Sequence, residues 1–414
     1  MRVKAGFSQV RNSILILIVT VGVFAGGYAL GVKGYKAEVT KSLQVNISRQ
    51  IPPGKNVDFS LFWQVWDTLG AKYFDKSKMV PSKMVYGAIA GMVSALGDPY
   101  TIYLPPTQNK IVNEDLSGSF EGVGIEIGYK NTHLAVVSPL PGSPAEKAGV
   151  KPGDYIVHIT DIKKNVDIDS ASIPLTEAVG YIRGSANTVV TLTLIRDGNS
   201  TPIVVNLTRD KLNVPSVIIS WVGENSTIAH VKIAKFDSET SSEWGKAVTE
   251  INSKCKTKKI TCKGIIVDLR NNPGGYMQSA VDIASDFIPV GTTVVIQENG
   301  DGTRAEYKSE RLPNLLNYKV VVLINGGSAS ASEILSGALR DDKAIKLVGD
   351  KSFGKGTIQE PIDIVGGSGL HVTTAKWLTP NGTWVHEKGL VPDVVVANKE
   401  DLVDLQLQAA VKLF

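Results

Sequence analysis

The sequence predicts a multidomain α/β protein whose C-terminal part contains a mostly parallel sheet. Between residues 210 and 396, short apolar runs such as 263–269 and 319–324 alternate with segments of helical periodicity. With 414 residues, 43% of them hydrophobic, the chain can bury a large core and form two or three domains. The net charge of +4 and the lack of a long basic run argue against a nucleic-acid partner.

The N-terminal residues predict a membrane anchor. Residues 1–12 form a basic tail, and residues 13–32 are mostly apolar and carry no charge. About 20 such residues can span a bilayer, and the basic flank places the tail in the cytoplasm. A signal peptide cut near Ala25 is the alternative, although its apolar region is usually about 7–15 residues. We therefore expect a single-pass anchor, with the rest of the chain in the periplasm or at the cell surface.

A polar linker and a helical region are predicted next. Residues 33–57 are polar and contain the sequence Pro-Pro-Gly, which is typical of a linker. Over 58–116, aromatic and aliphatic residues recur at helical spacing, which predicts an N-terminal helical region. Trp63 and Trp66 fit core positions better than a binding site.

Residues 117–209 predict a separate unit rich in strands. Ser143 and Pro144 fit the N-cap and first position of a short helix, and Gly149 fits its end. The unit closes with two strands joined by an Asp-Gly turn at 197–198. Together these features resemble a PDZ domain, circularly permuted as in bacterial proteases.

The PDZ resemblance implies that this unit binds the C-termini of proteins. Such domains hold the terminal carboxylate with backbone N–H groups, and the peptide adds as a strand to a sheet edge. The residues that match the carboxylate-binding loop are Gly122, Val123, Gly124 and Ile125. A tight glycine turn in an ordinary β-hairpin is the alternative for these four residues.

A serine-rich turn joins the predicted strand 319–324 to a helix over 330–340. Small residues surround its serines, and backbone N–H groups at a helix start can hold an oxyanion. None of the five histidines lies in this region, so Lys355, between two glycines, is the conspicuous base. Burial lowers the pKa of a lysine, which would provide a neutral amine. The residues alone leave open whether this turn is only a helix cap.

Residues 349–355 match most of a phosphate-binding loop. The next residue is Gly356, where a serine or threonine would have to bind Mg²⁺, and residues 357–361 fit a strand better than a helix. We therefore reject nucleotide binding.

Two motifs resemble the carboxyl-terminal processing proteases, which are also called tail-specific proteases and form peptidase family S41. The motifs are Ser-Ala-Ser-Ala-Ser-Glu-Ile at 328–334 and Phe-Gly-Lys-Gly-Thr-Ile-Gln at 353–359. The resemblance implies that Ser330 is the nucleophile of a Ser–Lys dyad, that Lys355 is its base, and that Gln359 orients the lysine. It extends over residues 58–396 and implies a crotonase/ClpP-like core over 210–396, with no cofactor and no metal.

A second turn follows the predicted strand 263–269, with the sequence Asn-Asn-Pro-Gly-Gly. In the family, the corresponding turn supplies one oxyanion donor and the residue after the nucleophile supplies the other. The resemblance therefore implies Ala331 and either Gly274 or Gly275. An ordinary turn is the alternative.

The remaining predictions concern cysteines and the C-terminus. Cys255 and Cys262 are close enough in sequence for a local disulfide, with two reduced thiols as the alternative. Two cysteines without a nearby histidine fall short of a metal site. Residues 397–414 predict a helix for packing or dimer contact, and a homodimer or an unknown adaptor remains open.

These observations predict a membrane-anchored serine endopeptidase that cleaves extracytoplasmic proteins. Its PDZ domain would recognise unfolded or flexible protein C-termini. One alternative is a non-catalytic PDZ scaffold. Another is a Ser–His–Asp hydrolase that uses His371 or His386.

Overall fold

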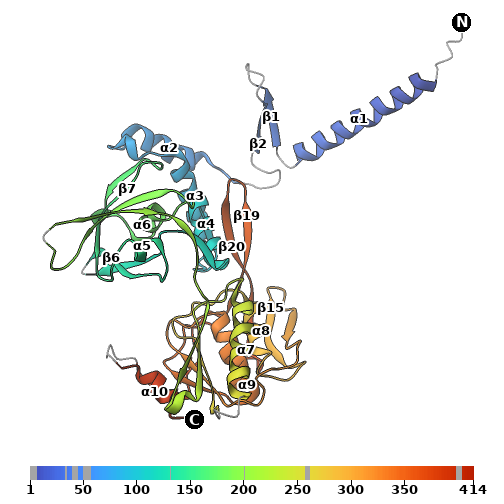
Figure 1. The fold of residues 1–414 in the computed structure, drawn as a ribbon. Coiled ribbons are helices and arrows are strands. Elements are labelled where there is room, and N and C mark those ends of the chain that lie inside the picture. The colour runs from blue at the N-terminus through green and yellow to red at the C-terminus, as the bar shows by residue number, and fades with distance from the viewer. Residues whose placement is uncertain are drawn as a thin grey trace, which may run out of the picture. The chain divides into compact units, whose positions relative to one another are not determined.

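The computed structural model describes residues 7–32, 35–39, 45–49, 57–130, 132–199, 201–256, 262–397 and 403–414. The fold is mixed α/β, as predicted (Figure 1). It divides into two compact units, Met1–Val85 and Tyr86–Phe414.

The first unit contains helix α1 (Phe7–Val32), strands β1 (Tyr35–Val39) and β2 (Val45–Arg49), helix α2 (Ser60–Lys72) and the start of α3 (Pro81–Ser94). Strands β1 and β2 form an antiparallel hairpin within the predicted linker. No helix in the described ranges is both long and apolar enough to cross a membrane. The predicted transmembrane anchor at 13–32 is therefore unsupported by the structure.

The aromatic residues of α2 are not core residues. Trp63 is 56% exposed and α2 has no buried residue, so the predicted core role is wrong. The aromatic rings pack on one another instead, with the ring centroids of Phe62 and Trp63 5.1 Å apart. Helical spacing groups apolar side chains on one face, but it cannot say whether another element covers that face.

The predicted PDZ unit is built mainly of antiparallel strands. Its elements are α4 (Pro106–Leu116), β4 (Ser119–Gly122), β5 (Ile125–Lys130), β6 (His133–Pro139), α5 (Pro144–Lys147), β7 (Tyr155–Asp161), β8 (Val166–Asp169), α6 (Leu175–Ile182), β9 (Val189–Ile195), β10 (Ile203–Thr208) and β11 (Asp210–Asn213). The main sheet has the order β10-β9-β7-β6-β5, with β8 beside β7, so β5 is an edge strand. Ser143 caps α5 as predicted, because its Oγ accepts a hydrogen bond from the Glu146 backbone N–H at 3.2 Å.

The C-terminal part contains the predicted parallel sheet. Its elements are β12 (Val217–Val222), β13 (Ile228–Ile233), α7 (Thr240–Lys256), β14 (Gly264–Asp268), α8 (Met277–Ala284), β17 (Val320–Ile324), α9 (Ala331–Lys343), β18 (Lys346–Gly349), β21 (Val394–Val395) and α10 (Leu405–Val411). The order is β12-β13-β14-β17-β18-β21, and only β12 is antiparallel to its neighbour.

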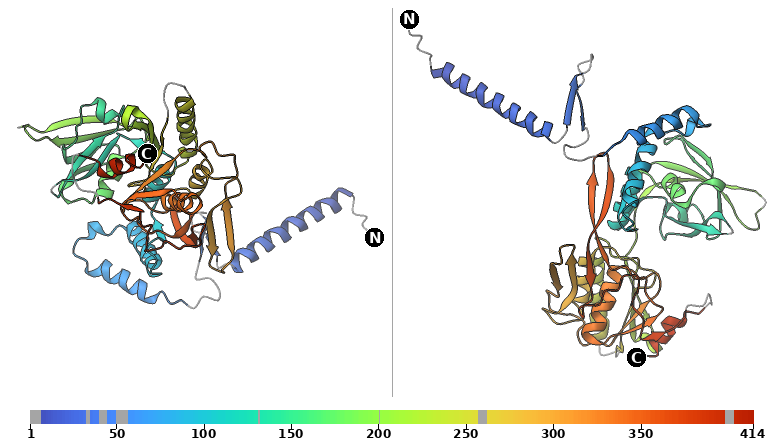
Figure 2. Two further views of the ribbon diagram at one scale, coloured as in Figure 1. Left: turned by 90° about the horizontal axis from the view of Figure 1, so that it is seen from below. Right: turned by 180° about the vertical axis from the view of Figure 1, so that it is seen from behind.

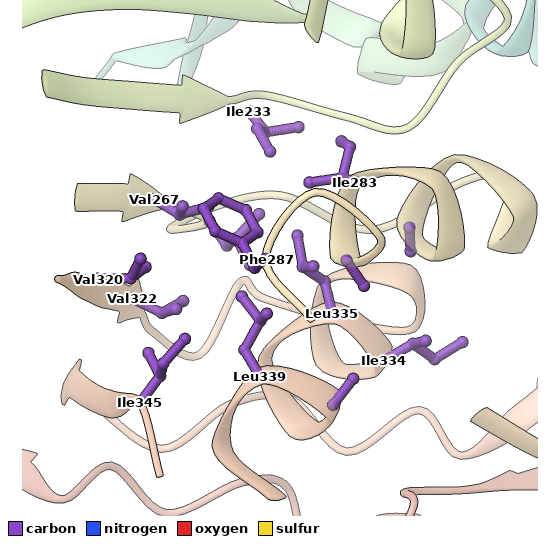
Figure 3. Close-up of a cluster of buried hydrophobic side chains, with 14 of the residues drawn as sticks. Ile233, Val267, Ile283, Phe287, Val320, Val322, Ile334, Leu335, Leu339 and Ile345 are labelled. Carbon is purple, nitrogen blue, oxygen red and sulfur yellow. The ribbon is translucent and has the colours of Figure 1, made fainter. Parts of the chain in front are cut away.

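Both faces of this sheet are covered, which explains its unbroken apolar strands. Helices α7, α8 and α9 pack on one face around Phe287, Leu335 and Leu339 (Figure 3). Helix α10 covers part of the other face through Leu407 and Ala410, so the predicted packing role of the C-terminal helix is confirmed.

A second, antiparallel sheet lies beside the first. It contains β15 (Thr293–Asn299), β16 (Arg304–Lys308), β19 (Thr357–Ile364), β20 (Ser368–Leu378) and β3 (Ile102–Leu104). The order is β16-β15-β20-β19, with β3 also paired to β20. Strands β19 and β20 form a long two-stranded ribbon that extends away from β15 and β16 (Figure 2). Strand β19 begins where the rejected nucleotide site would require a helix.

A disulfide joins Cys255 at the end of α7 to Cys262 just before β14, with Cα atoms 5.3 Å apart. Of the two alternatives for these cysteines, a disulfide or two reduced thiols, the structure therefore has the disulfide. The segment 257–261 between the two cysteines lies outside the described residues.

Candidate active site

The three serines of the turn between β17 and α9 differ in their surroundings. Ser328 and Ser332 are fully buried, and both donate hydrogen bonds to backbone carbonyls, at 2.8 and 2.9 Å. Ser330 is only half-buried and stands at the N-cap of α9. The structure thus leaves Ser330 as the accessible serine of this turn.

The backbone of Ser330 is strained. Its φ of 53° and ψ of −113° lie outside the regions that residues with a side chain usually occupy. Such strain, which typically costs about 1–3 kcal/mol, persists only where the surrounding structure holds it in place. Here the chain turns sharply from a buried strand into a buried helix, which leaves the N-cap side chain at the end of the sheet.

The Asn-Asn-Pro-Gly-Gly turn after β14 lies directly against Ser330. A Cβ atom added to Gly274 would be 2.9 Å from Ser330 Cβ and 3.0 Å from the Ala331 nitrogen. The Gly274 N–H is already used, because it donates to Asn272 Oδ1 at 2.9 Å. Among the described residues, the N–H groups of Gly275 and Ala331 have no hydrogen-bond partner. These two N–H groups are the ones available to an oxyanion.

Lys355 enters the site on the loop before β19. Its Nζ lies 5.1 Å from the ring centroid of Tyr100, and its backbone carbonyl accepts a hydrogen bond from Trp377 Nε1 at 2.9 Å. Burial lowers the pKa of Lys355, and the carboxylate of Asp98 partly opposes this shift. The amine is therefore easier to deprotonate than an exposed lysine.

Gln359 lies on β19, beside a bulge in the pairing with β20. Its amide Nε2 donates to the hydroxyls of Thr357 and Thr373, at 2.9 and 3.2 Å. Within the described residues, no hydrogen bond joins Lys355 Nζ to Ser330 Oγ or to Gln359. The structure thus brings the Ser330 and Lys355 loops together without a direct bond between the two side chains.

The loop before β3 contributes residues to which the sequence reasoning gave no role. Tyr100 contacts Lys355 as described, and the Asp98 carboxylate accepts hydrogen bonds from the Tyr100 N–H and the Thr101 hydroxyl, at 3.0 and 2.6 Å. Thr101 Oγ1 in turn accepts from the Thr373 N–H on β20 at 3.0 Å. The Gly-Asp-Pro-Tyr-Thr sequence at 97–101 precedes Lys355 by more than 250 residues, so no local sequence signal places this turn beside the lysine.

Neither candidate histidine has the partners of a catalytic base. The ring of His386 stacks on Trp384 with centroids 5.0 Å apart, and its Nδ1 is buried without a partner among the described residues. His371 Nε2 is similarly unpartnered, and burial together with the charge of Lys355 lowers the His371 pKa. No carboxylate is hydrogen-bonded to either ring in the described part of the chain.

The predicted carboxylate loop joins β4 to the edge strand β5. Gly124 has a φ of +76°, and an added Cβ would be 2.2 Å from Ser143 Cβ, so only glycine fits there. The carbonyls of Val123 and Gly124 accept hydrogen bonds from Ala145 and Leu140, at 3.0 and 2.9 Å. These bonds turn both carbonyls toward α5 and the residues before it.

Fold and site together define a class of protein: an α/β protein with a serine nucleophile candidate and an attached unit built mainly of antiparallel strands. Residues 227–396 match peptidase family S41, residues 136–196 match the PDZ domain, and residues 17–107 match the activating protease CtpB N-terminal domain. The chain belongs to peptidase family S41.

Individual relatives agree with this assignment. A probable CtpA-like serine protease of Staphylococcus aureus (strain bovine RF122 / ET3-1) is 40% identical over 333 residues, which cover 80% of this chain and 63% of the relative. The carboxy-terminal processing protease CtpA of Bacillus subtilis (strain 168) is 36% identical over 331 residues, 80% of this chain and 67% of that protein. The chain therefore spans less than two thirds of the length of the S. aureus relative.

A solved structure is also similar to this chain. The photosystem II D1 C-terminal processing protease superposes with a TM-score of 0.50 at 29% sequence identity. The match covers 85% of this chain and 96% of that structure.

Proposed function

We propose that this chain is a serine endopeptidase that uses Ser330 as nucleophile and Lys355 as general base. The observation that carries the proposal is the position of Ser330, on a strained turn that lies against Gly274 and directly precedes Ala331. The N–H groups of Ala331 and of Gly275, the residue after Gly274, have no hydrogen-bond partner among the described residues. Donors fixed in advance where negative charge develops are a major source of catalysis in acyl transfer. We also infer a crotonase/ClpP-like core from the family resemblance.

In this mechanism, neutral Lys355 accepts the proton of the Ser330 hydroxyl as the serine oxygen attacks the scissile carbonyl. The N–H groups of Gly275 and Ala331 bind the resulting oxyanion. The Lys355 ammonium then protonates the departing amine, which leaves an acyl-enzyme. Water deprotonated by Lys355 hydrolyses the ester and restores Ser330.

A side-chain movement of Lys355 belongs to this proposal. An ammonium group is attracted to the face of an aromatic ring, as Nζ is to Tyr100, whereas a neutral amine is not. Deprotonation therefore releases the amine to rotate toward Ser330 Oγ. Gln359 would orient it there after exchanging its bonds to Thr357 and Thr373.

The substrates we propose are unfolded or flexible proteins with an apolar C-terminus. Edge strand β5 has an open side, and Ile125 and Ile127 on β5 pack with Leu175 of α6 in the core of this unit. A peptide could add along β5 with its carboxylate at Gly122–Ile125. Binding there would raise the rate of cleavage in the peptidase core.

We further propose that the catalytic part acts outside the cytoplasm. The Cys255–Cys262 disulfide supports this location, because such bonds persist mainly in oxidising compartments. Membrane attachment through residues 13–32 rests on the sequence pattern alone. Whether a protease added to intact cells digests the catalytic part would test both statements.

The experiment that tests the function compares full-length wild type with Ser330→Ala, Lys355→Ala and Lys355→Arg. Each protein is incubated with a long unstructured peptide ending in three apolar residues, and mass spectrometry follows cleavage between pH 6 and pH 10. We expect only wild type to cut, with a rate that rises with pH as Lys355 loses its proton.

A second substrate separates recognition from chemistry. The same peptide with an amidated C-terminus lacks the carboxylate and should be cut more slowly. Binding of the free peptide without cleavage by wild type would favour the non-catalytic scaffold. Cleavage by Lys355→Ala would show that the base is another residue.

A further inference from the structure

Glu333 in the first turn of α9 is a buried carboxylate with an unusual set of partners. It is 0% exposed, and its hydrogen-bond partners among the described residues are three backbone N–H groups and one hydroxyl, with no cationic side chain among them. Both oxygens instead accept two hydrogen bonds each, from the donors Ser352 Oγ (2.6 Å), Gly354 N (2.7 Å), Ser330 N (2.9 Å) and Lys355 N (2.9 Å). An ionised carboxylate has about four acceptor positions, so all of them are occupied.

A helix cap explains only one of these four bonds. In a capping box, the glutamate at the third helical position accepts from the backbone N–H of the N-cap residue, here Ser330. The other three donors belong to residues 352–355, which lie about 20 positions further along the chain. Burial of a charge without a counter-ion is costly. Because a glutamine would satisfy the capping bond as well, capping alone does not explain a carboxylate at this position.

The bonds of Glu333 fix both catalytic loops from one point. Oε2 accepts from the N–H of Ser330 and from the N–H of Lys355, each at 2.9 Å, so one atom sets the spacing of the two backbones. The bond to Ser330 also holds the strained φ of 53° and removes that N–H from the oxyanion site. The adjacent N–H, that of Ala331, stays unpartnered among the described residues.

We propose that Glu333 is the positioning residue of the active site, which holds the nucleophile loop and the base loop in register through its four hydrogen bonds. This inference rests on the proposed function, because it assigns Glu333 a role in the reaction of Ser330 and Lys355. The carboxylate acts through these two residues and has no contact with substrate.

Glutamine is the sharpest substitution, because it keeps the size of the side chain and changes its bonding. Its NH₂ group is a donor and would face two of the four N–H or O–H donors. The loops must then separate to relieve the contact. A misplacement of about 1 Å between reacting groups can cost about 100-fold in rate.

Asp286 offers a matched control in the same core. It is 2% exposed and accepts hydrogen bonds from Trp244 Nε1, Asn314 Nδ2 and Arg311, each at 2.7 Å. Asp286→Asn therefore disturbs a comparably buried carboxylate that does not bond either catalytic loop. It tests whether loss of any buried carboxylate has the same effect.

The experiment measures kcat, KM and thermal unfolding of full-length wild type, Glu333→Gln and Asp286→Asn on the unstructured peptide. We expect Glu333→Gln to lower kcat about 100-fold with KM changed less than about twofold, because positioning affects the chemical step rather than binding. Asp286→Asn should lower the unfolding temperature and leave kcat near that of wild type.

A second variant covers the case in which Glu333→Gln does not fold. Ser352→Ala removes one donor to the carboxylate and should lower kcat about tenfold at unchanged KM, as expected for a smaller misplacement. Unchanged kcat in a folded Glu333→Gln, or in Ser352→Ala, would overturn the inference. An equal loss in Asp286→Asn would do the same. An inactive wild type would instead refute the proposed function.

Discussion

The ion pair between Asp268 and Arg270, just before the Asn-Asn-Pro-Gly-Gly turn, should make the stability of the C-terminal α/β part depend on pH. Asp268 at the end of β14 is 1% exposed and accepts hydrogen bonds from Arg270 Nε and Nη2 (2.9 and 2.6 Å) and His230 Nε2 (3.0 Å). Burial alone would raise the pKa of Asp268, but the bonds from Arg270 and His230 outweigh it and lower the pKa to about 2.

The magnitude follows from the two pKa values. The unfolded chain has an aspartate pKa near 3.8, and each pKa unit is worth about 1.4 kcal/mol. Ionised Asp268 therefore adds about 2.5 kcal/mol to the folding free energy at neutral pH. Because the folded pKa is lowered, this contribution is complete well above pH 3.8 and is lost as the pH falls through about 2.

Urea unfolding of full-length wild type and Asp268→Asn at pH 7 and pH 2 measures this contribution. We expect the variant to be less stable at pH 7 by about 2.5 kcal/mol or more, since Arg270 loses a buried partner. At pH 2 the difference should shrink by about 2 kcal/mol, because Asp268 is then about half protonated in the folded wild type and the unfolded aspartate is almost fully protonated. A difference that stays the same at both pH values would refute the reasoning.

Two further predictions concern the site. In Gly275→Ala, the new Cβ would lie 2.0 Å from the Phe236 carbonyl oxygen and displace the turn. We expect kcat to fall about 100- to 1000-fold, which is the usual effect of losing one oxyanion donor. Titration of the variant with a reactive phosphonate would show whether Ser330 is still accessible. A kcat equal to that of wild type would contradict the assignment of the Gly275 N–H as an oxyanion donor. Asp98→Asn removes the charge that raises the pKa of Lys355, so the rise of kcat/KM with pH should move to lower pH. If the pH midpoint of kcat/KM in Asp98→Asn is unchanged or higher, the expected lowering of the Lys355 pKa is contradicted.

Much of the fold could be predicted from the sequence, because its signals are local. The strands 263–269 and 319–324 were expected from their apolar runs, and β14 and β17 lie within one residue of them. The short helix after Ser143 begins at Pro144, because a cap acts over a single turn. The choice of Ser330 came from the family resemblance and did not follow from composition.

The features that only the tertiary structure decided depend on contacts between distant residues. Whether Trp63 is covered, and whether Gly274 or Gly275 has an unpartnered N–H, depends on neighbours that local periodicity cannot identify. Tyr100 reaches Lys355 across more than 250 residues of sequence. The sequence by itself determined where the strands, turns and candidate catalytic residues stand along the chain. The packing decided which polar groups are buried and which distant donors satisfy them, as the four donors do at Glu333, because a buried polar group must find its partners within the fold.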